Sequence, residues 1–144
     1  MERPDARSDA RERALYLLYE AHSKGIDPAD TIELQVLEPD ELTTALVRGV
    51  ASARDRIDAA IERRATGWSL ARMPVLDVNI MRLATYELLD RPHVPVAVVI
   101  DEAVELAKRF STDDSGRFVN GLLAALAREL RDTDPPGVDP ATDV

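Results

Sequence analysis

Apolar residues recur every three or four positions through almost every long segment of this chain, and this spacing restricts its fold more than any other feature. In residues 95–110 the repeating side chains are Val96, Ile100, Ala103, Ala107 and Phe110. Such spacing places them on one face of an α-helix, whereas a half-buried β-strand would need strict alternation. The β-branched start of the segment is typical of strands, but the helical period continues through its second half. The pattern therefore predicts a helix.

The same spacing predicts six or seven helices and no strand. The expected elements, including one turn at 68–73, cover residues 5–24, 27–37, 38–67, 68–73, 74–90, 95–110 and 115–130. In the second of these, Asp27 is the expected N-cap and Pro28 the first helical residue. The longest, 38–67, carries a continuous apolar stripe. We expect one compact, all-α helical bundle domain over residues 1–130, because a chain of 144 residues can bury a single core.

Composition excludes several classes of protein. Residues 131–144 are acidic and rich in proline, so we expect a disordered tail there. Cysteine is absent, which removes thiolate sites and is compatible with a reducing cytoplasm. The longest apolar run, residues 94–100, is too short to cross a bilayer, and the charged N-terminus lacks the apolar segment of a signal peptide. A cytoplasmic protein without membrane contact is therefore expected.

No catalytic pattern is present, so we expect neither an enzyme nor a bound metal or cofactor. Asp113 and Asp114 are adjacent acids, which capping and the dipole of a following helix explain most simply. Trp68 is interpreted as a packing anchor. The net charge of −9 argues against a free-standing nucleic-acid binder. Any such contact would need a local basic patch or a basic partner.

Three arginines near the N-terminus, Arg3, Arg7 and Arg11, are spaced four apart. On a helix they form one gently drifting stripe. Nearby acids allow pairs such as Asp9 with Arg13, so an ion-paired solvated helix is one interpretation. The other interpretation is a track of arginines for phosphates. The residues alone leave both open.

An Asn-Gly pair, Asn120 and Gly121, interrupts the last predicted helix, where Gly costs roughly 1 kcal/mol against Ala. We interpret Gly121 as making room where two helices, or this helix and the preceding loop, approach closely. Asn120 would hydrogen-bond to backbone at the same junction. A simple packing contact and a seat for the loop at 111–117 both remain compatible with the sequence.

Three segments together resemble the NusB family of bacterial transcription antitermination factors. They are ARERALYLLYEA (10–21), LDVNIMRLATYELL (76–89) and VPVAVVIDEAVELAKRFSTDDSGRFVNGLL (94–123). The resemblance covers about residues 6–130 and implies an all-α fold of two three-helix bundles plus a seventh helix. The NusB-like domain of rRNA cytosine methyltransferases shares this fold, but FVNG in this chain suits the stand-alone factor better than the LVNA typical of those enzymes.

The resemblance implies a non-enzymatic factor that pairs with NusE, a protein of the small ribosomal subunit. The pair would bind the boxA element of rRNA leader transcripts and help RNA polymerase read through terminators in the antitermination complex. It also implies contact residues at matching positions. These are, for RNA, Arg7, Arg11, Asp114, Arg117 and Phe118, and, for NusE, Tyr19 and Asp77. Arg3 is added to the expected RNA contacts because it continues the four-residue spacing of Arg7 and Arg11.

This chain departs from the family pattern at Ser8 and Asp9, where better-known members continue a run of arginines. Fewer phosphate contacts weaken RNA binding and reduce its salt dependence. An acid such as Asp114 opposes phosphate, so a base edge or sugar hydroxyl is its expected contact. Two alternatives are a protein-binding or self-associating module, such as a homodimer, and a detached targeting domain related to the methyltransferases. Arginines gathered on one face would favour RNA binding, and acids that break the patch would favour the module.

Overall fold

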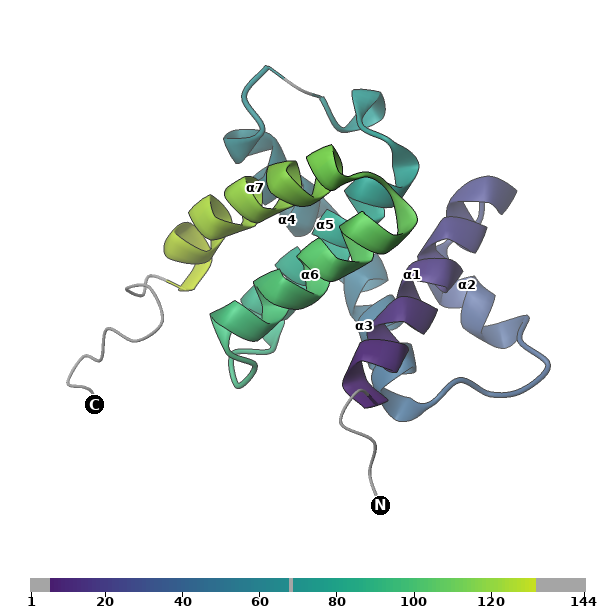
Figure 1. Cartoon of the computed structure of the whole chain (residues 1–144). Coiled ribbons are helices and arrows are strands. Elements are labelled where there is room, and N and C mark those ends of the chain that lie inside the picture. Colours follow the sequence, from purple (N-terminus) through teal and green to yellow (C-terminus); the bar gives the residue numbers. More distant parts are fainter. Residues whose placement is uncertain (1–5, 68, 132–144) are drawn as a thin grey trace.

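The computed structural model describes residues 6–67 and 69–131, and every long regular element in these ranges is a helix (Figure 1). In chain order they are α1 (Ala6–Lys24), α2 (Pro28–Glu33), α3 (Glu41–Ser52), α4 (Arg54–Arg64), the 3₁₀ turn η1 (Leu70–Arg72), α5 (Val75–Asp90), α6 (Val96–Phe110) and α7 (Asp113–Arg131). The all-α prediction is confirmed. Arg3, Trp68 and the predicted tail beyond Arg131 lie outside the described residues.

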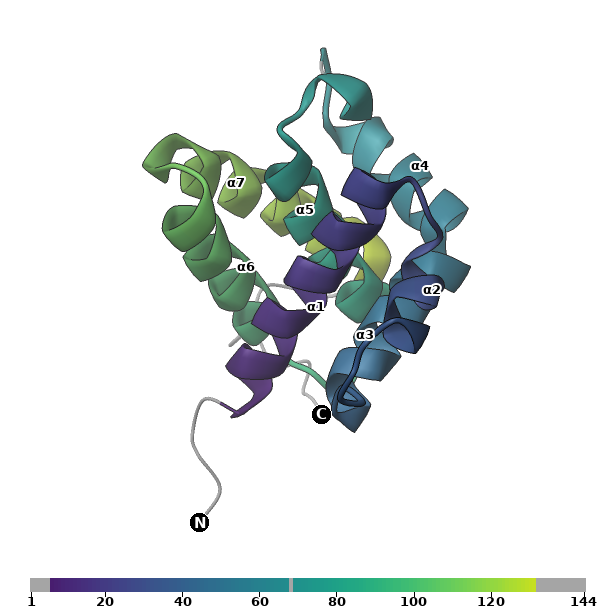
Figure 2. The ribbon, with the colours of Figure 1, turned by 90° about the vertical axis from the view of Figure 1, so that its right-hand side faces the viewer.

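Two hydrophobic clusters share one central helix, α5. The smaller cluster contains residues of α1, α2 and α3 together with Leu83 of α5. The larger cluster contains residues of α4, α5, α6 and α7 together with Leu15 of α1. Figure 2 shows α5 between α1 and α3 on one side and α6 and α7 on the other. Eleven of the 16 residues of α5 are buried, because this helix packs against neighbours on several faces. The expected two-subdomain bundle is thus built around α5.

Side-chain caps fix the starts of two helices. Asp27 caps α2 by accepting a hydrogen bond from the backbone N–H of Ala29 at 2.8 Å. Asp40 caps α3 in the same way, accepting from the backbone N–H of Thr43 at 2.7 Å. Pro28 is the first residue of α2, as predicted. These caps satisfy backbone donors that have no partner within their own helix.

The segment predicted as one helix over 38–67 is instead two helices that meet at Ala53. The backbone of Ala53 leaves the helical range, with φ −102° and ψ 14°, and its side chain is buried. Before this point the stripe residues, such as Val50, belong to the smaller cluster, and after it those such as Ile57 belong to the larger one. The bend lets a single apolar stripe enter both clusters.

Two glycines inside helices, Gly49 of α3 and Gly121 of α7, have opposite surroundings. A Cβ on Gly49 would lie 2.1 Å from Cζ of Tyr86, so glycine at this position makes room for the tyrosine ring. A Cβ on Gly121 would meet nothing within 4 Å. The prediction that Gly121 permits a close helix approach is therefore wrong. Gly121 and Asn120 lie on the exposed side of α7.

Alanine at these two glycines should have opposite effects on stability. Gly121→Ala is expected to raise the free energy of unfolding by about 0.5–1 kcal/mol, because alanine favours the helix and meets no neighbour. Gly49→Ala is expected to lower it by about 1–3 kcal/mol, because the ring of Tyr86 must move. Urea unfolding of both variants beside the wild type measures the changes. Shifts of the same sign would contradict these assignments.

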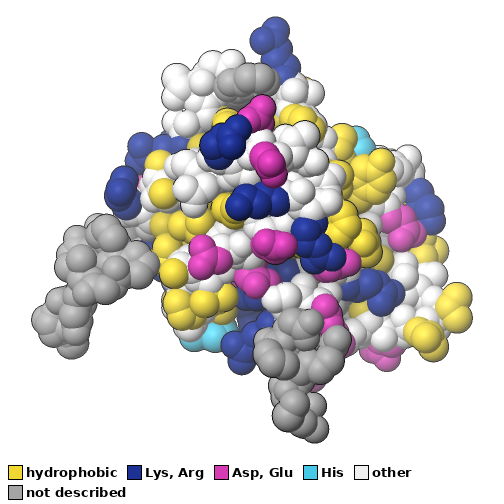
Figure 3. All heavy atoms as spheres, in the orientation of Figure 1, with side chains coloured by type: hydrophobic (Ala, Val, Ile, Leu, Met, Phe, Trp, Pro, Cys, Tyr) yellow, Lys and Arg dark blue, Asp and Glu magenta, His cyan; other side chains and the backbone are white. Residues whose placement is uncertain are grey.

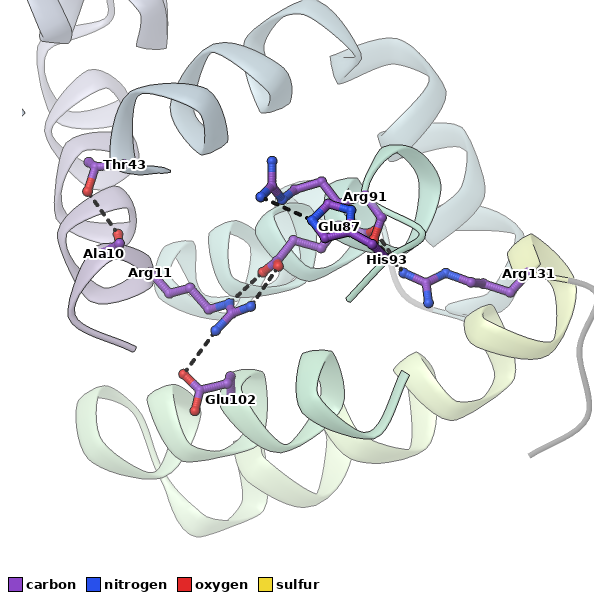
Figure 4. A network of polar contacts seen from close by, with 8 residues as sticks. All are labelled: Ala10, Arg11, Thr43, Glu87, Arg91, His93, Glu102 and Arg131. Atoms are coloured by element: carbon purple, nitrogen blue, oxygen red, sulfur yellow. Dashed lines mark hydrogen bonds and ion pairs between the residues drawn. The ribbon is translucent and has the colours of Figure 1, made fainter. Parts of the chain in front are cut away.

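Arg131 ties the end of α7 to the end of α5 (Figure 4). Its Nε donates to the carbonyl of Leu88 at 2.9 Å and its Nη1 to that of Val94 at 2.7 Å. Its Nη2 donates to the carbonyls of Glu87 and Arg91 at 3.0 and 3.1 Å. Glu87 and Leu88 lie in the last turn of α5, and Arg91 and Val94 lie in the turn that follows it, so the guanidinium acts as a cap supplied by a distant part of the chain. Arg131, assigned from the sequence to the tail, is an anchored residue of α7.

Candidate functional site

Arg11, expected on an RNA-facing surface, is buried instead. Its Nε and Nη2 donate to Oε2 and Oε1 of Glu87 at 2.7 and 2.9 Å, and its Nη1 lies 3.5 Å from Oε1 of Glu102 (Figure 4). The side chains of Arg11 and Glu87 are only 5% and 2% exposed. Burial by itself lowers the pKa of Arg11, but the hydrogen bonds and charges of the two glutamates outweigh it, and the pKa is raised. Arg11 therefore joins α1 to α5 and α6 and is not available to a phosphate.

The arginine stripe itself explains this correction. Four-residue steps from Arg7 reach Arg11 and then Leu15, and Leu15 is fully buried. Each step turns by about 40° beyond a full helical turn, so the stripe moves from solvent at Arg7 into the interior. Leu15 was the sequence signal for an inward Arg11. Within the described residues, Arg7 is the exposed member of the predicted arginine track.

Removing one partner of the Arg11–Glu87 pair should destabilise the whole fold. Arg11→Met is expected to lower the free energy of unfolding by about 3–5 kcal/mol, because Glu87 is left buried without a counter-charge. Arg11→Met with Glu87→Met should recover most of that loss, since both charges are replaced by apolar groups. The exposed control Arg7→Met should stay within about 0.5 kcal/mol of the wild type.

Chemical denaturation of the wild type and these three proteins provides the measurement. Equal losses in the single Arg11 variant and the double variant would show that packing, and not the charge pair, is responsible.

Two tyrosines on α1 expose aromatic surface. Tyr16 is 48% and Tyr19 is 46% exposed, and both lie on the same side of the helix three residues apart. The Tyr16 hydroxyl donates to Oε2 of Glu12 at 3.1 Å, and its ring packs edge-on against Phe110 of α6. The hydrogen bond to Glu12 raises the pKa of Tyr16. The sequence pointed to Tyr19 as a partner contact but gave no signal for Tyr16, whose exposure depends on where α6 crosses α1.

Asp77, expected on the partner surface, is also buried, with 4% of its surface exposed. Its Oδ2 accepts a hydrogen bond from the Ser115 hydroxyl at 2.8 Å. The backbone N–H of Ser115 in turn donates to Oγ1 of Thr112 at 2.9 Å, which makes Thr112 the cap of α7. Asp77 therefore links the first turn of α5 to the first turn of α7. This internal contact corrects the surface role predicted for it.

The remaining predicted RNA residues lie in the first turns of α7. The helix begins two residues earlier than expected, so Asp113 and Asp114 lie inside its first turn, where the helix dipole favours negative charge. Asp114 forms an exposed ion pair with Arg117. Phe118 is partly buried against the larger cluster. Arg117 is thus a surface cation whose charge is partly balanced by its neighbour.

Acidic and basic side chains are mixed over α6 and α7 and do not form a continuous basic patch on the face shown in Figure 3. The start of α1, which carries Arg7, lies at the lower end of the molecule in Figures 1 and 2, and the start of α7 lies near the upper end. The structure therefore separates Arg7 from Arg117 and buries Arg11. Local basicity is weaker than the arginine spacing suggested.

Comparison with known protein families identifies the family of this chain. The profile of the NusB family matches residues 8–128. The chain belongs to the NusB family. "Transcription antitermination protein NusB" of Saccharopolyspora erythraea is 51% identical over 128 residues, which cover 85% of this chain and 86% of that protein. The protein of the same name from Streptomyces avermitilis is 50% identical over 135 residues, covering 88% and 93%.

Solved NusB structures have the same fold. T. maritima NusB superposes with a TM-score of 0.79 at 36% identity, covering 90% of this chain and 94% of its own. A structure of antitermination factors NusB and NusE in complex with dsRNA gives a TM-score of 0.75 at 25% identity, covering 88% and 99%. The resemblance seen in the sequence is confirmed, and with it a non-enzymatic NusB antitermination factor. Among the described helices, none is long and apolar enough to cross a membrane.

Proposed function

We propose that this NusB protein acts in the cytoplasm on rRNA operons, where it binds boxA RNA together with NusE as part of the RNA polymerase antitermination complex. The likeness to the structure that holds NusB, NusE and dsRNA, over 88% of this chain, is the observation that carries the proposal. Its action consists of assembly and not of chemical catalysis, so it needs no cofactor.

The proposed NusE surface centres on α1, at Tyr19 and Tyr16. Half-exposed aromatic rings are typical anchors of protein interfaces because they bury much area at a small entropic cost. The net charge of −9 also favours a basic partner. Asp77 is not part of this surface, since it is buried and bonded to Ser115 at the start of α7.

Replacing Tyr19 with an acidic residue should weaken NusE binding without disturbing the fold. Tyr19→Asp is expected to weaken NusE binding by about 2 kcal/mol or more, the loss of an interface hot spot. The melting temperature should change little, because the residue is 46% exposed. Val98→Asp on α6, at a side chain 40% exposed, is the matched control and should leave NusE binding unchanged. Calorimetric titration with NusE and a thermal melt of each variant measure both properties. A large fall in melting temperature for Tyr19→Asp would assign this residue to the core.

RNA binding by this chain alone should be weak. Arg11 neutralises Glu87 in the interior, and Arg117 is paired with Asp114. Ser8 and Asp9 occupy two positions of the arginine run found in better-known members. A basic partner docked beside α1 would extend the phosphate track and strengthen binding.

A salt titration of RNA binding tests which arginines of this protein neutralise RNA phosphates. In the presence of NusE, Arg7→Ala with Arg117→Ala should cost about 1 kcal/mol or more and make the salt slope shallower, by roughly 0.7 for each phosphate that is no longer neutralised. Ser8→Arg with Asp9→Arg should raise affinity and steepen the slope. Three superimposable curves for the wild type and both double variants would identify these arginines as ordinary surface residues.

A self-associating module with weak RNA binding is the alternative function. The mixture of acids and bases in Figure 3 favours it, as do two tyrosines that a second copy could cover. Sedimentation velocity across a range of concentrations distinguishes the two. A homodimer that NusE cannot dissociate, together with no boxA binding by the mixture, would favour the module.

A further inference from the structure

Three large apolar side chains are exposed together in the segment between α2 and α3, which we call the 34–37 loop. Val36 is 99% exposed, Leu37 is 79% exposed and Leu34 is 56% exposed. Isolated apolar residues are common on protein surfaces, but three within four positions form a patch of the kind that binds other molecules. None of the three belongs to either hydrophobic cluster of the described residues.

Polar contacts hold the 34–37 loop at both ends. The side-chain amide of Gln35 donates from Nε2 to the carbonyl of Thr31 at 3.0 Å, and its Oε1 accepts from Nη2 of Arg13 at 3.1 Å. At the other end Pro39 is buried, and the Asp40 side chain caps α3. A segment that is already fixed in an exposed conformation loses little entropy when a partner binds it.

The charge around the 34–37 loop is strongly negative. Residues 30–41 contain five acids and no lysine or arginine. The acids are Asp30, Glu33, Glu38, Asp40 and Glu41. Two neighbouring arginines offset part of this charge, since Arg13 bonds to Gln35 and Arg48 lies 3.9 Å from Glu33. An apolar patch with this charge repels RNA and anionic lipid and attracts a basic surface. A symmetric contact between the loops of two copies would set acids against acids.

The 34–37 loop and the exposed tyrosines flank different sides of α1. The ring of Tyr16 packs against Phe110 of α6, whereas Arg13 reaches Gln35 after the end of α2. Figure 2 shows α6 on one side of α1 and α2 with α3 on the other. A partner seated over Tyr16 and Tyr19 on the α6 side therefore does not have to cover the loop.

We propose that the 34–37 loop inserts into an apolar groove, rimmed by lysine or arginine, on RNA polymerase. The proposal rests on the function proposed above. Among the components of that complex, NusE occupies the tyrosine surface and the acids repel RNA, which leaves the polymerase as the partner. Val36 and Leu37 supply the buried contact, and acids such as Glu33 and Glu38 face the basic rim.

Photo-crosslinking in the assembled complex identifies what the loop contacts. Benzoylphenylalanine is placed at position 36 and, as a control, at position 98, an exposed valine of α6. Each protein is assembled with NusE and RNA polymerase on a boxA transcript. The probe at position 36 should crosslink to one polymerase site, where apolar residues are flanked by lysine or arginine, and the probe at position 98 should not. Crosslinks from position 36 to NusE, to a second copy of this chain or to no protein would overturn the proposal.

Affinity measurements test the apolar contact and its acidic surroundings separately. Val36→Ser with Leu37→Ser should weaken binding of the NusE and boxA complex to polymerase about tenfold or more, the loss of an interface hot spot. Val98→Ser is the matched control and should leave this affinity unchanged. Glu33→Gln with Glu38→Gln should weaken it about two- to fivefold at low salt and hardly at all at high salt.

The double serine variant separates the inference from the proposed function. Its melting temperature and its affinities for NusE and boxA RNA should match the wild type, because Val36 and Leu37 are exposed and lie outside the core. If NusE and boxA RNA bind normally but polymerase binding is unchanged in this variant, the inference is overturned and the proposed function stands. Failure of the wild-type protein to bind NusE and boxA RNA would instead refute the proposed function.

Discussion

The buried ion pair between Arg11 and Glu87 is the interaction on which the two halves of this fold depend. It connects α1, which contributes Ala14, Leu17 and Leu18 to the smaller hydrophobic cluster and Leu15 to the larger one, to α5 and, through Glu102, to α6. Apolar side chains can pack at many relative orientations, whereas a bidentate contact between a guanidinium and a carboxylate allows few. The pair therefore fixes how α1 crosses the bundle. That crossing in turn exposes Tyr16 and Tyr19 and places Glu12 beside Arg109.

The burial of Arg11 affects which charges remain on the protein surface. An arginine committed to the interior is lost to RNA, and the surface that remains is a mixture of both signs with a net negative total. Long-range attraction of RNA by such a surface is weak. Short-range recognition can still be selective, because a hydrogen bond to a base edge does not depend on net charge. The proposed RNA binding therefore depends on a basic partner for most of the contacts to phosphates.

The helices could be predicted from the sequence, because each long segment has a 3.6-residue apolar period, and Asp27 with Pro28 has the residue types of a helix start. The break at Ala53 could not, since the apolar stripe continues through it and nothing in the stripe shows that its two halves enter different clusters. Arg11 and Asp77 appeared as surface charges because their partners, Glu87 and Ser115, are far away in the chain. Gly121 appeared to need a close neighbour, which only the packed structure could disprove. Local patterns thus predicted the elements, and long-range polar contacts decided which charged residues stay on the surface.

The hydrogen bonds of Arg131 also have a consequence for truncated forms of the chain. A chain cut after Leu130 would lack the guanidinium that the carbonyls of Leu88, Val94 and Arg91 share, although it keeps all the apolar side chains of α7. A chain cut one residue later keeps all of these hydrogen bonds. The difference between the two truncations is therefore a set of hydrogen bonds from one side chain. Fusions and trimmed versions of this protein should therefore retain Arg131.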